Sequence, residues 1–371
     1  MVLGHLPSIR GGLGELAKSG QHSRFIEGYL KPYARAFEEV RYFSYLPESL
    51  EPYTQDPEVL ARVRILPGVR VHPWVYTFYM AFRYRRQFSG CSVLRVFQVT
   101  GVIPALLAKR LFGVPFVTTY GFWYSTLAGS QVSGWLRRWV AALGLAAADA
   151  VVVTTLDLQA HVAARVGPSK VHLIPNGVDT HLFRPGARAA GPTKRILYAG
   201  RLSKEKNLVT LIEAAAKLLG RFDLRLTLIG DGPARRSLET SARRLRVPVE
   251  FRPFVDHREL PTCFGEADAF VLPSLTEGHP KILLEAMSCG VPCVASNIGG
   301  NRSILADGET GLLFDPGDAG ALADRLERVF TDGELARRLG EHARSEVLAR
   351  YDLRALVGRE IELLRRVAAG G

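Results

Sequence analysis

The stretch EGHPKILLEAMSCGVP, Glu277 to Pro292, is the starting point for interpreting the rest of the chain. Most of it has the composition of a helix that is apolar on nearly every side, except for one carboxylate, Glu285. A helix of this kind is normally buried, and a buried carboxylate is costly unless it has a partner. Glu285 therefore indicates either a ligand contact or a buried ion pair with an arginine.

The residues in front of this helix predict an anion site. AFVLPS (269–274) is typical of a buried strand, LTEGHP is a loop, and Pro280 suits the first position of a helix. Backbone N–H groups at a helix start attract anions, and Gly278 lets a ligand approach the backbone. Carboxylates accept hydrogen bonds from sugar hydroxyls, which suits Glu285 for a ribose and Glu277 for a second polyol. The residues expected at this site are Glu277, Gly278, His279, Pro280, Lys281, Ile282, Leu283 and Glu285.

A second loop carries two cations. In YAGRLSKEKNL (198–208) a strand ends at Gly200, and a helix starts near residue 207. Arg201 and Lys206 lie between them, where a guanidinium fork and an ammonium could together neutralise a diphosphate. The alternative is a pair of solvated loop cations.

Two further motifs are strands that run into turns. LIGDGP (228–233) runs into a glycine turn at Gly230, and LIPNGVD (173–179) runs into an Asn-Gly turn that contains Asn176.

The whole chain alternates short apolar runs with helical patterns, which predicts parallel sheets covered by helices on both faces. The segment FRPGARAAGPTK (183–194) lacks apolar periodicity and is typical of a linker. We therefore expect an α/β protein with two Rossmann-like domains whose sheets face a deep cleft. The predicted domains are 1–185 and 186–351, with a C-terminal helix, 352–371, that packs back on the first domain.

Composition excludes several classes of protein. With 371 residues, 47% hydrophobic and 23% charged, the chain can bury two cores. Its four cysteines do not predict a disulfide framework, and Cys289 and Cys293 lack the second Cys/His pair of a metal site, so we expect small buried hydrophobes. The start has no signal-peptide pattern, and the uncharged run 111–135 contains proline and several glycines, which favours strand and loop over a membrane span. We expect a cytoplasmic protein.

The net charge of +12 is uneven, because residues 1–185 hold 20 Lys+Arg against 11 Asp+Glu. Two basic aromatic stretches lie there, YTFYMAFRYRRQF (76–88) and WLRRWV (135–140). They predict contact with an anionic membrane surface or an anionic acceptor, so that the protein could be peripheral on the inner face of the membrane. The alternative is a solvated arginine-rich face. Nucleic acid is not expected, because no recognition module is visible.

Taken together, these motifs resemble those of the retaining glycosyltransferases of family 4, which have the GT-B fold. Two glutamates separated by seven residues, Glu277 and Glu285, match the family pattern. LIPNGVDTHLFRP, GRLSKEKN, LIGDGP, ADAFVLPS and GGNRSILADGETGLLF match as well, in the order and spacing of the family. The resemblance is dense over residues 150–314 and thins in the first half.

The resemblance implies that Arg201 and Lys206 hold the diphosphate of a nucleotide-sugar donor and that Glu285 holds its ribose. Glu277, with the backbone from His279 to Ile282, would face the donor sugar and phosphate. Arg201, Lys206 and Glu277 are thus the predicted catalytic residues. No cofactor and no metal are expected, since the cations and the helix start take the place of a divalent ion and the chain has no Asp-x-Asp motif.

The first half departs from the family pattern in two places. Family members often begin with a strand and a Gly-Gly loop; here Gly11, Gly12 and Gly14 follow only a short apolar segment, so an abbreviated first strand is expected. Many members carry a histidine in the loop after the strand matched by PFVTTY (115–120), where this chain has Tyr120. The glycines, Tyr120 and Asn176 are predicted to lie on the acceptor side or to form a phosphate loop.

The leading hypothesis is a metal-independent transfer of a sugar, with retention, from a nucleotide diphosphate to a hydroxyl of a saccharide or lipid-linked acceptor, in polysaccharide or glycolipid assembly. Two alternatives remain. One is a nucleotide-sugar epimerase on the same fold, which would use an acid and a base that the sequence does not offer as a clear pair. The other is a non-catalytic nucleotide-sugar-binding subunit. Neither the donor nor the acceptor can be read from the sequence.

Overall fold

The computed structural model describes residues 1–18, 20–121, 131–186 and 191–370, and for 131–137 only the backbone. The chain forms two compact units, Met1–Pro175 with Arg354–Gly371, and Asn176–Leu353. The division falls after Pro175, whereas the sequence prediction places it after Pro185. Residues 187–190 of the predicted linker lie outside the described residues.

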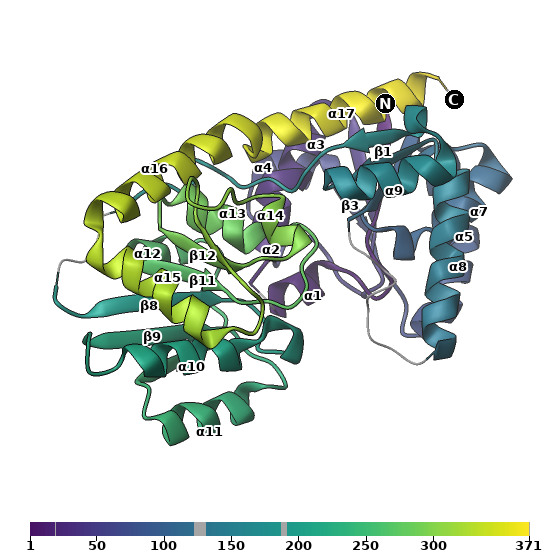
Figure 1. The fold of residues 1–371 in the computed structure, drawn as a ribbon. Helices are drawn as coiled ribbons and strands as arrows, with labels where there is room; N and C mark the ends of the chain where they lie inside the picture. Colours follow the sequence, from purple (N-terminus) through teal and green to yellow (C-terminus); the bar gives the residue numbers. More distant parts are fainter. Residues whose placement is uncertain (19, 122–130, 187–190, 371) are drawn as a thin grey trace. The chain divides into compact units, whose positions relative to one another are not determined.

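The first unit is built on a seven-stranded parallel sheet (Figure 1) with the order β3-β2-β1-β4-β5-β6-β7. Its strands are β1 (Val2–Leu6), β2 (Glu39–Phe43), β3 (Val63–Leu66), β4 (Val93–Val96), β5 (Phe116–Tyr120), β6 (Ala150–Val153) and β7 (Val171–Leu173). β1 pairs with both β2 and β4 over four residue pairs each. The segment that looked abbreviated in sequence is therefore a complete interior strand.

The helices of this unit follow their strands in the order expected for an α/β unit. They are α1 (Leu13–Lys18), α2 (His22–Phe25), the π-helix η1 (Ile26–Leu30), α3 (Lys31–Ala36), α4 (Pro57–Arg62), α5 (Pro73–Arg83), α6 (Arg85–Ser89), η2 (Val99–Gly101), α7 (Ile103–Phe112), α8 (Gln131–Ala147), α9 (Leu156–Val166), η3 (Pro168–Lys170) and α17 (Leu353–Ala369). Within the described part of the chain, none of the helices has both the length and the apolar character needed to cross a bilayer.

The second unit has a six-stranded parallel sheet with the order β10-β9-β8-β11-β12-β13. Its strands are β8 (Lys194–Ala199), β9 (Leu224–Ile229), β10 (Val249–Arg252), β11 (Ala269–Leu272), β12 (Cys293–Ser296) and β13 (Leu312–Phe314). Its helices are η4 (Lys204–Lys206), α10 (Leu208–Leu218), α11 (Arg235–Leu245), α12 (Leu260–Gly265), α13 (Lys281–Ser288), α14 (Gly299–Arg302), α15 (Ala319–Thr331) and α16 (Gly333–Arg350).

The most apolar strands occupy the interior of the sheets. Every residue of β11 and of β12 is buried, as expected for strands that helices cover on both faces. Cys289 and Cys293 are buried in the same core, and burial raises the pKa of the Cys289 thiol to about 12, so both behave as small apolar side chains. β3 was missed in sequence because this edge strand is short and one of its four residues is exposed.

Both sheets reverse their winding direction once. The reversal lies between β1 and β4 in the first unit and between β8 and β11 in the second. In open parallel sheets the crevice at such a reversal, outside the carboxyl ends of the strands, is where ligands bind. The strand order alone therefore predicts ligand contacts for the loops after β1 and β4 in the first unit and for the loops after β8 and β11 in the second.

A buried ion pair attaches the C-terminal helix α17 to the sheet of the first unit. Arg95 on β4 donates from Nε and Nη2 to the two carboxylate oxygens of Glu360 on α17, over 2.7 and 3.1 Å. Tyr33 donates its hydroxyl hydrogen to the same carboxylate, and Arg95 Nη2 also bonds Thr119 Oγ1 at 2.8 Å. Each buried charge thus has several partners, which such a pair needs to be stable.

Candidate functional site

The loops after β8 and β11 flank the reversal point of the second sheet. β8 and β11 are paired neighbours, with Ala269 opposite Ile196 and Phe270 opposite Leu197. The loop after β8 carries Arg201 and Lys206, and the loop after β11 carries Glu277. Adjacent parallel strands end at the same edge of a sheet, so the fold brings these three predicted residues into one region.

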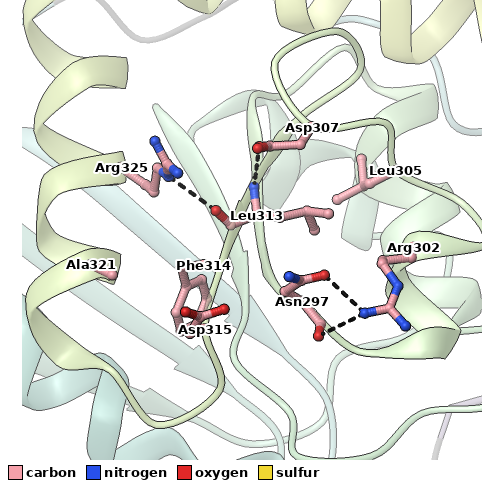
Figure 2. Close-up of a pocket in the computed structure, with 9 residues that line it drawn as sticks. All are labelled: Asn297, Arg302, Leu305, Asp307, Leu313, Phe314, Asp315, Ala321 and Arg325. Carbon is pink, nitrogen blue, oxygen red and sulfur yellow. Dashed lines mark hydrogen bonds between the residues drawn. The ribbon is translucent and has the colours of Figure 1, made fainter.

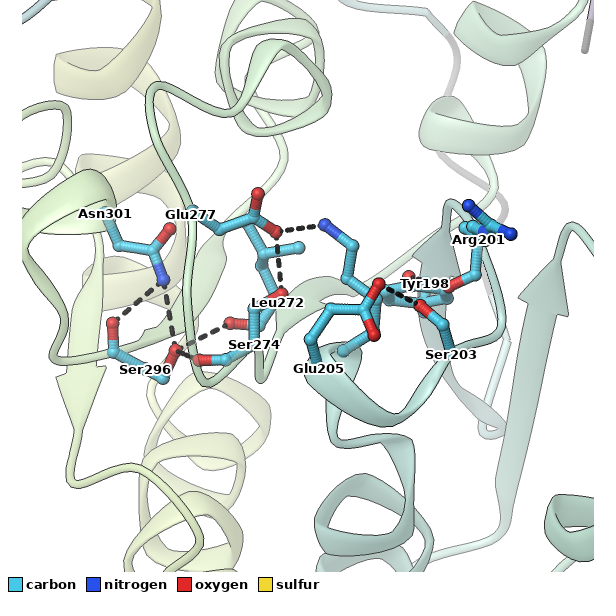
Figure 3. A network of polar contacts seen from close by, with 10 residues as sticks. Tyr198, Arg201, Ser203, Glu205, Leu272, Ser274, Glu277, Ser296 and Asn301 are labelled. Atoms are coloured by element: carbon cyan, nitrogen blue, oxygen red, sulfur yellow. Dashed lines mark hydrogen bonds and ion pairs between the residues drawn. The ribbon is translucent and has the colours of Figure 1, made fainter. Parts of the chain in front are cut away.

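Lys206 and Glu277 form an ion pair across these two loops (Figure 3). The Nζ atom of Lys206 lies 2.5 Å from Oε1 of Glu277, and Ser274 Oγ donates to the same oxygen over 2.7 Å. The side chains of Lys206 and Glu277 keep 21% and 12% of their surface exposed. A ligand can therefore reach both groups, and each side chain is held in position by the other.

Arg201 is exposed, and its backbone rather than its guanidinium is fixed. Tyr198, buried on β8, donates its hydroxyl hydrogen to the carbonyl oxygen of Arg201 over 2.9 Å. In Figure 3 the guanidinium of Arg201 does not point toward the carboxylate of Glu277. The loop thus presents an exposed guanidinium beside an ammonium that is already paired with Glu277.

Three residues that sequence reasoning missed hold the Glu277 loop in place. Asn301 Nδ2 donates to the carbonyl oxygen and the hydroxyl of Ser296, over 2.9 and 3.1 Å, and Ser296 Oγ donates to the carbonyl oxygen of Ser274. A Cβ on Gly300 would lie 2.4 Å from the carbonyl oxygen of Glu277, so only glycine allows α14 to approach this closely. The sequence GGNR matched a family motif, but nothing in it showed what Gly300 and Asn301 contact.

Gly200 and Gly230 serve the packing of one loop on another. Gly230 has φ +134°, and a Cβ there would lie 2.0 Å from the carbonyl oxygen of Gly200. Only glycine fits this combination of conformation and contact. The amide of Gly200 donates to the carbonyl oxygen of Ile229 over 2.9 Å, so the residue before Arg201 is bonded to the end of β9. Both glycines were predicted to bind the donor; the structure shows how they shape the loops around the predicted donor cations.

Helix α13 begins at Lys281 directly after Pro280, and no side chain caps its first turn. Glu277 to Leu283 therefore form one continuous loop and helix start, with the polar backbone groups that helix termini leave for other partners. Glu285, in the second turn, is buried, and its Oε1 lies 3.0 Å from Nε2 of His257. This carboxylate therefore has a buried histidine as one of its partners. His257 was missed because nothing in VDHREL distinguishes it from other loop histidines.

His279 is a buried neutral side chain. Burial, with smaller contributions from the charges of Lys281 and Arg350, lowers the pKa of His279 to about 3. Its carbonyl oxygen accepts a bond of 2.7 Å from Nδ2 of Asn176. Asn176 was predicted to lie on the acceptor side or to form a phosphate loop; it belongs to the second unit, where its side chain bonds the backbone in front of α13.

The glycine loop of the first unit is occupied by a side chain of the protein itself. The amides of Leu13 and Gly14 donate to the two oxygens of the Glu48 carboxylate over 2.9 and 2.8 Å, and Ser44 Oγ donates to it over 2.5 Å. A Cβ on Gly12 would lie 2.7 Å from Glu48 Oε1. The amides of this loop, which were predicted to face a phosphate, therefore bond an internal anion. The amide of Gly11 is likewise taken, by the carbonyl of Ser8 at 2.8 Å.

Tyr120, at the end of β5, is buried, and the fold places a histidine beside it. The ring centroids of Tyr120 and His161, on α9, lie 6.1 Å apart in a stacked arrangement. Burial and the charge of Arg165 lower the pKa of His161. His161 is 41 residues from Tyr120 along the chain, so sequence reasoning about the loop after β5 could not find it. The next residues, 122–130, lie outside the described residues.

A pocket of about 490 Å³ lies elsewhere in the second unit, between β13, α14 and α15 (Figure 2). Its lining includes Asp307 and Arg325, which bond the amide and carbonyl of Leu313 over 2.7 and 3.0 Å and so close the free edge of β13. None of the predicted donor-binding residues lines this pocket. Among the described residues, no group of three His, Cys, Asp or Glu side chains could hold a metal ion.

Comparison with known proteins agrees with this arrangement. The family described as Glycosyl transferases group 1 matches residues 180–346, and Glycosyltransferase Family 4 matches residues 24–182. An alpha-D-kanosaminyltransferase of Streptomyces kanamyceticus is 31% identical over 269 residues, which are 67% of this chain and 70% of that protein. The chain belongs to glycosyltransferase family 4.

Other relatives of this family 4 glycosyltransferase match over shorter shares of their length. A 2-deoxystreptamine N-acetyl-D-glucosaminyltransferase of Niallia circulans is 34% identical over 161 residues, 43% of this chain and 41% of that protein. A glycogen synthase of Mycobacterium tuberculosis is 32% identical over 67% of this chain and 62% of its own. These names are of transferases and synthases, which does not favour the epimerase or the non-catalytic alternative.

The solved structures similar to this family 4 glycosyltransferase share its fold. A sucrose-phosphate synthase from Thermosynechococcus elongatus has a TM-score of 0.83 at 24% identity, with all of both chains covered. The Anabaena protein HepE in complex with UDP has a TM-score of 0.79 at 18% identity, covering 99% of this chain and 100% of that one. The predicted GT-B fold, with two units on parallel sheets, is confirmed.

Proposed function

We propose that this family 4 glycosyltransferase moves a sugar from a nucleotide diphosphate to a hydroxyl group, with retention at the anomeric carbon. The ion pair of Lys206 and Glu277, beside the exposed Arg201, is the observation that supports this best. Two cations and one carboxylate thus lie on the loops beside the reversal point of the second sheet, and we assign the carboxylate to the donor sugar. HepE has been solved with UDP and with UDP-glucose, and its similar fold supports a nucleotide diphosphate as donor.

The proposed chemistry depends on charge that develops on the leaving group. As the bond between the sugar and the diphosphate breaks, the bonding electron pair moves to the phosphate oxygen. Arg201, Lys206 and the start of α13 stabilise that charge more in the transition state than in the bound donor, which is the origin of catalysis. Glu277 accepts hydrogen bonds from the sugar hydroxyls, and its contact with Lys206 holds both side chains in position before the donor arrives.

The acceptor hydroxyl attacks from the side of the leaving group in this proposal, and its proton passes to the departing phosphate oxygen. The product therefore keeps the anomeric configuration of the donor, and no protein base is required. The scheme needs neither a cofactor nor a metal ion, because Arg201 and Lys206 supply the positive charge. Transfer that persists in excess EDTA would support this; a requirement for a divalent ion would overturn it.

A screen of nucleotide sugars tests the donor. Ligand that binds only the folded protein raises its melting temperature by mass action, so UDP-, GDP- and ADP-sugars can be ranked by thermal shift. The best donor, with a panel of saccharide and lipid-linked acceptors, should give a product whose anomeric configuration is read by NMR. Inversion would contradict the proposed mechanism. An epimer formed without acceptor would favour an epimerase, and donor binding without transfer to any acceptor would favour a binding subunit.

The acceptor is proposed to be lipid-linked and presented at a cytoplasmic membrane surface, as in polysaccharide or glycolipid assembly. Helix α5 supports this with a stripe of exposed apolar side chains at positions i, i+3, i+4 and i+7, namely Val75, Phe78, Tyr79 and Phe82. Its opposite face, with Tyr76 and Met80, is buried against the core. Exposed arginines follow directly, at 83, 85 and 86. Aromatic side chains with adjacent cations are typical of helices that lie on anionic lipid.

Vesicle flotation tests this surface. The protein should float with vesicles that contain anionic lipid, and less with neutral vesicles or at high salt, because screening weakens the contribution of the arginines. Phe78→Ser with Phe82→Ser should abolish flotation while preserving the melting temperature. Leu348→Ser on α16, which also replaces an exposed apolar side chain, is the matched control. Equal flotation of all three proteins, or none for the wild type, would remove the membrane from the proposal.

A further inference from the structure

The pocket between β13, α14 and α15 is lined by charged side chains of both signs. Its cations are Arg302, at the end of α14, and Arg325 on α15. Its anions are Asp307, before β13, and Asp315, directly after it. In Figure 2 the two arginines lie on opposite sides of Leu313. Two arginines against two aspartates give the lining no formal net charge, although it is rich in groups that form hydrogen bonds.

Three of these side chains are held in place by the backbone around them. Arg302 donates from Nη1 to the carbonyl oxygen and the side-chain oxygen of Asn297, over 3.3 and 3.1 Å. Asp307 Oδ1 accepts from the amide of Leu313, and Arg325 Nε donates to its carbonyl oxygen. No hydrogen bond within the described residues uses Nη2 of Arg302, either Nη of Arg325 or Oδ2 of Asp307. The pocket thus offers donors and acceptors that are already positioned, which lowers the ordering cost of binding.

Asp315 adds a carboxylate at the edge of the sheet. It directly follows β13, so it lies at the carboxyl edge, where parallel sheets bind their ligands. Its side chain is exposed, and no hydrogen bond or ion pair joins that side chain to the described part of the chain. The loops that carry Lys206 and Glu277 leave the same edge of the sheet, but none of the predicted donor-binding residues lines the pocket. The pocket is therefore distinct from the donor loops.

The balance of charge selects the class of ligand. The aspartates disfavour a phosphate or another anion, and the arginines disfavour a metal ion or an ammonium group. An apolar ligand would strip water from these groups and give no hydrogen bonds in return. A hydroxyl both donates and accepts, so neighbouring hydroxyls satisfy a guanidinium and a carboxylate together. The buried Leu305, Leu313 and Phe314 complete the lining with an apolar surface, which suits the C–H face of a sugar ring.

We propose that this pocket binds a sugar unit of a saccharide acceptor and retains the acceptor on the second unit. The pocket volume of about 490 Å³ lies within the range of about 300–1,000 Å³ that is typical of small-molecule sites. The inference rests on the proposed function and narrows its acceptor to a saccharide with at least one sugar unit besides the one that receives the transfer. Arg302, Arg325 and Asp315 are the residues assigned to that additional unit.

Binding of free saccharides without nucleotide tests the pocket directly. NMR titration with glucose, N-acetylglucosamine and maltotriose should show binding to the wild type. Asp315→Ala removes a carboxylate that makes no bond within the described residues, so the melting temperature should hold. The affinity should fall about tenfold, the scale of losing a hydrogen bond to a charged group. Asp324→Ala is the matched control, because Asp324 is an exposed aspartate on α15 outside the lining.

A second variant blocks the pocket by volume. Ala321 lines it from the first turn of α15, and its amide accepts no change on substitution because only the backbone bonds the cap at Asp318. Ala321→Phe should therefore abolish saccharide binding and keep the helix. With an oligosaccharide acceptor, Asp315→Ala should raise the KM for the acceptor about tenfold, with kcat and the KM for the donor within about twofold. With a monosaccharide acceptor its kinetics should match the wild type.

The opposite results overturn the inference. A wild type that binds none of the three saccharides, or that binds them no better than Asp315→Ala and Ala321→Phe, shows that the pocket does not hold a sugar. A loss of affinity in Asp324→Ala equal to that in Asp315→Ala shows the same. A free amino acid such as glycine carries paired charges that also suit a balanced lining. Binding of glycine that Asp315→Ala abolishes, with no saccharide binding, would assign the pocket to an amino acid instead.

Failure of the proposed function has a different signature. The wild type would then show no thermal shift with UDP-, GDP- or ADP-sugars and no transfer. If the wild type binds a donor and transfers its sugar, and both variants bind and use oligosaccharides as the wild type does, the proposed function stands and the saccharide pocket alone is rejected.

Discussion

The Nζ atom of Lys206 lies 2.5 Å from Oε1 of Glu277, although 71 positions separate the two residues along the chain. They meet because β8 and β11 are neighbours in the sheet and both loops leave its carboxyl edge. Ser274 donates to the same carboxylate oxygen, so Glu277 is oriented from two sides. The pair is built before any ligand arrives, which reduces the reorganisation that the reaction would otherwise require.

Lys206→Ala should lower transfer by about 10²-fold or more, the scale of losing one group that stabilises transition-state charge. The substitution also removes the charged partner of Glu277 and leaves its carboxylate with Ser274. Steady-state kinetics with the best donor measure the effect, and Arg201→Ala should fall in the same range. Lys204→Ala is the control, because Lys204 is an exposed lysine on the same short helix. Near-normal turnover of Lys206→Ala would contradict the proposal that Lys206 stabilises charge on the leaving diphosphate.

The sequence carried enough information to place these residues on strand-end loops but not to pair them. Periodicity and turn residues located β8, β11 and the start of α13, because these are local properties of the chain. The bond between Lys206 and Glu277 depends on which strands are neighbours, which is a long-range property. Likewise, one partner of Glu285 is His257, in a loop that carries no distinctive pattern.

The first unit was harder to predict for a different physical reason. β1 contains Gly4 and His5 and is short, so its apolar run looked incomplete, yet it pairs with β2 and β4 in the interior of the sheet. The glycines of the next loop looked like a phosphate site. A glycine that makes room for a ligand and a glycine that makes room for Glu48 have the same sequence pattern, and only the position of the Glu48 carboxylate in the fold distinguishes the two cases.

Gly300→Ala should lower transfer and stability together. A Cβ at this position would lie 2.4 Å from the carbonyl oxygen of Glu277, so either α14 or the Glu277 loop must move. Overpacking of this kind costs about 1–3 kcal/mol, and misplacement of the loop should reduce kcat. Urea denaturation and kinetics measure the two effects. At Gly333 a Cβ meets nothing within 4 Å, so Gly333→Ala should change neither.

Glu360→Ala should destabilise the first unit by about 3–5 kcal/mol, because it leaves the buried Arg95 charge without its partner. The side chains of Arg95 and Glu360 are only 3% and 5% exposed, so water cannot compensate. Arg95→Met combined with Glu360→Leu should cost less than the sum of the single changes in a denaturant-based double-mutant cycle. For comparison, Arg337→Ala breaks only exposed pairs on α16, which solvent screens, and should cost far less than Glu360→Ala. Additive losses at Arg95 and Glu360 would show that the two residues do not act as a pair.

His5→Phe should make the free energy of unfolding less dependent on pH. His5 is enclosed by the rings of Phe25, Tyr33, Tyr42 and Phe97, and neither of its ring nitrogens has a hydrogen-bond partner among the described residues. Burial, and then the charge of Arg95, lower its pKa to about 3. In the unfolded chain a histidine has a pKa of about 6.5.

The direction of the effect follows from these two pKa values. Between pH 6.5 and 3 the unfolded chain binds a proton that the folded protein does not, so the wild type should lose stability as the pH falls through this range. Linkage sets the slope at up to about 1.4 kcal/mol per pH unit. His5→Phe lacks this contribution, and the buried His279, present in both proteins, cancels in the difference. Urea denaturation at pH 7, 6 and 5 should therefore show an advantage of His5→Phe that grows as the pH falls, and that grows more from pH 6 to 5 than from pH 7 to 6. Parallel curves for the two proteins would mean that His5 is protonated in the fold, or that the first unit opens to water around it.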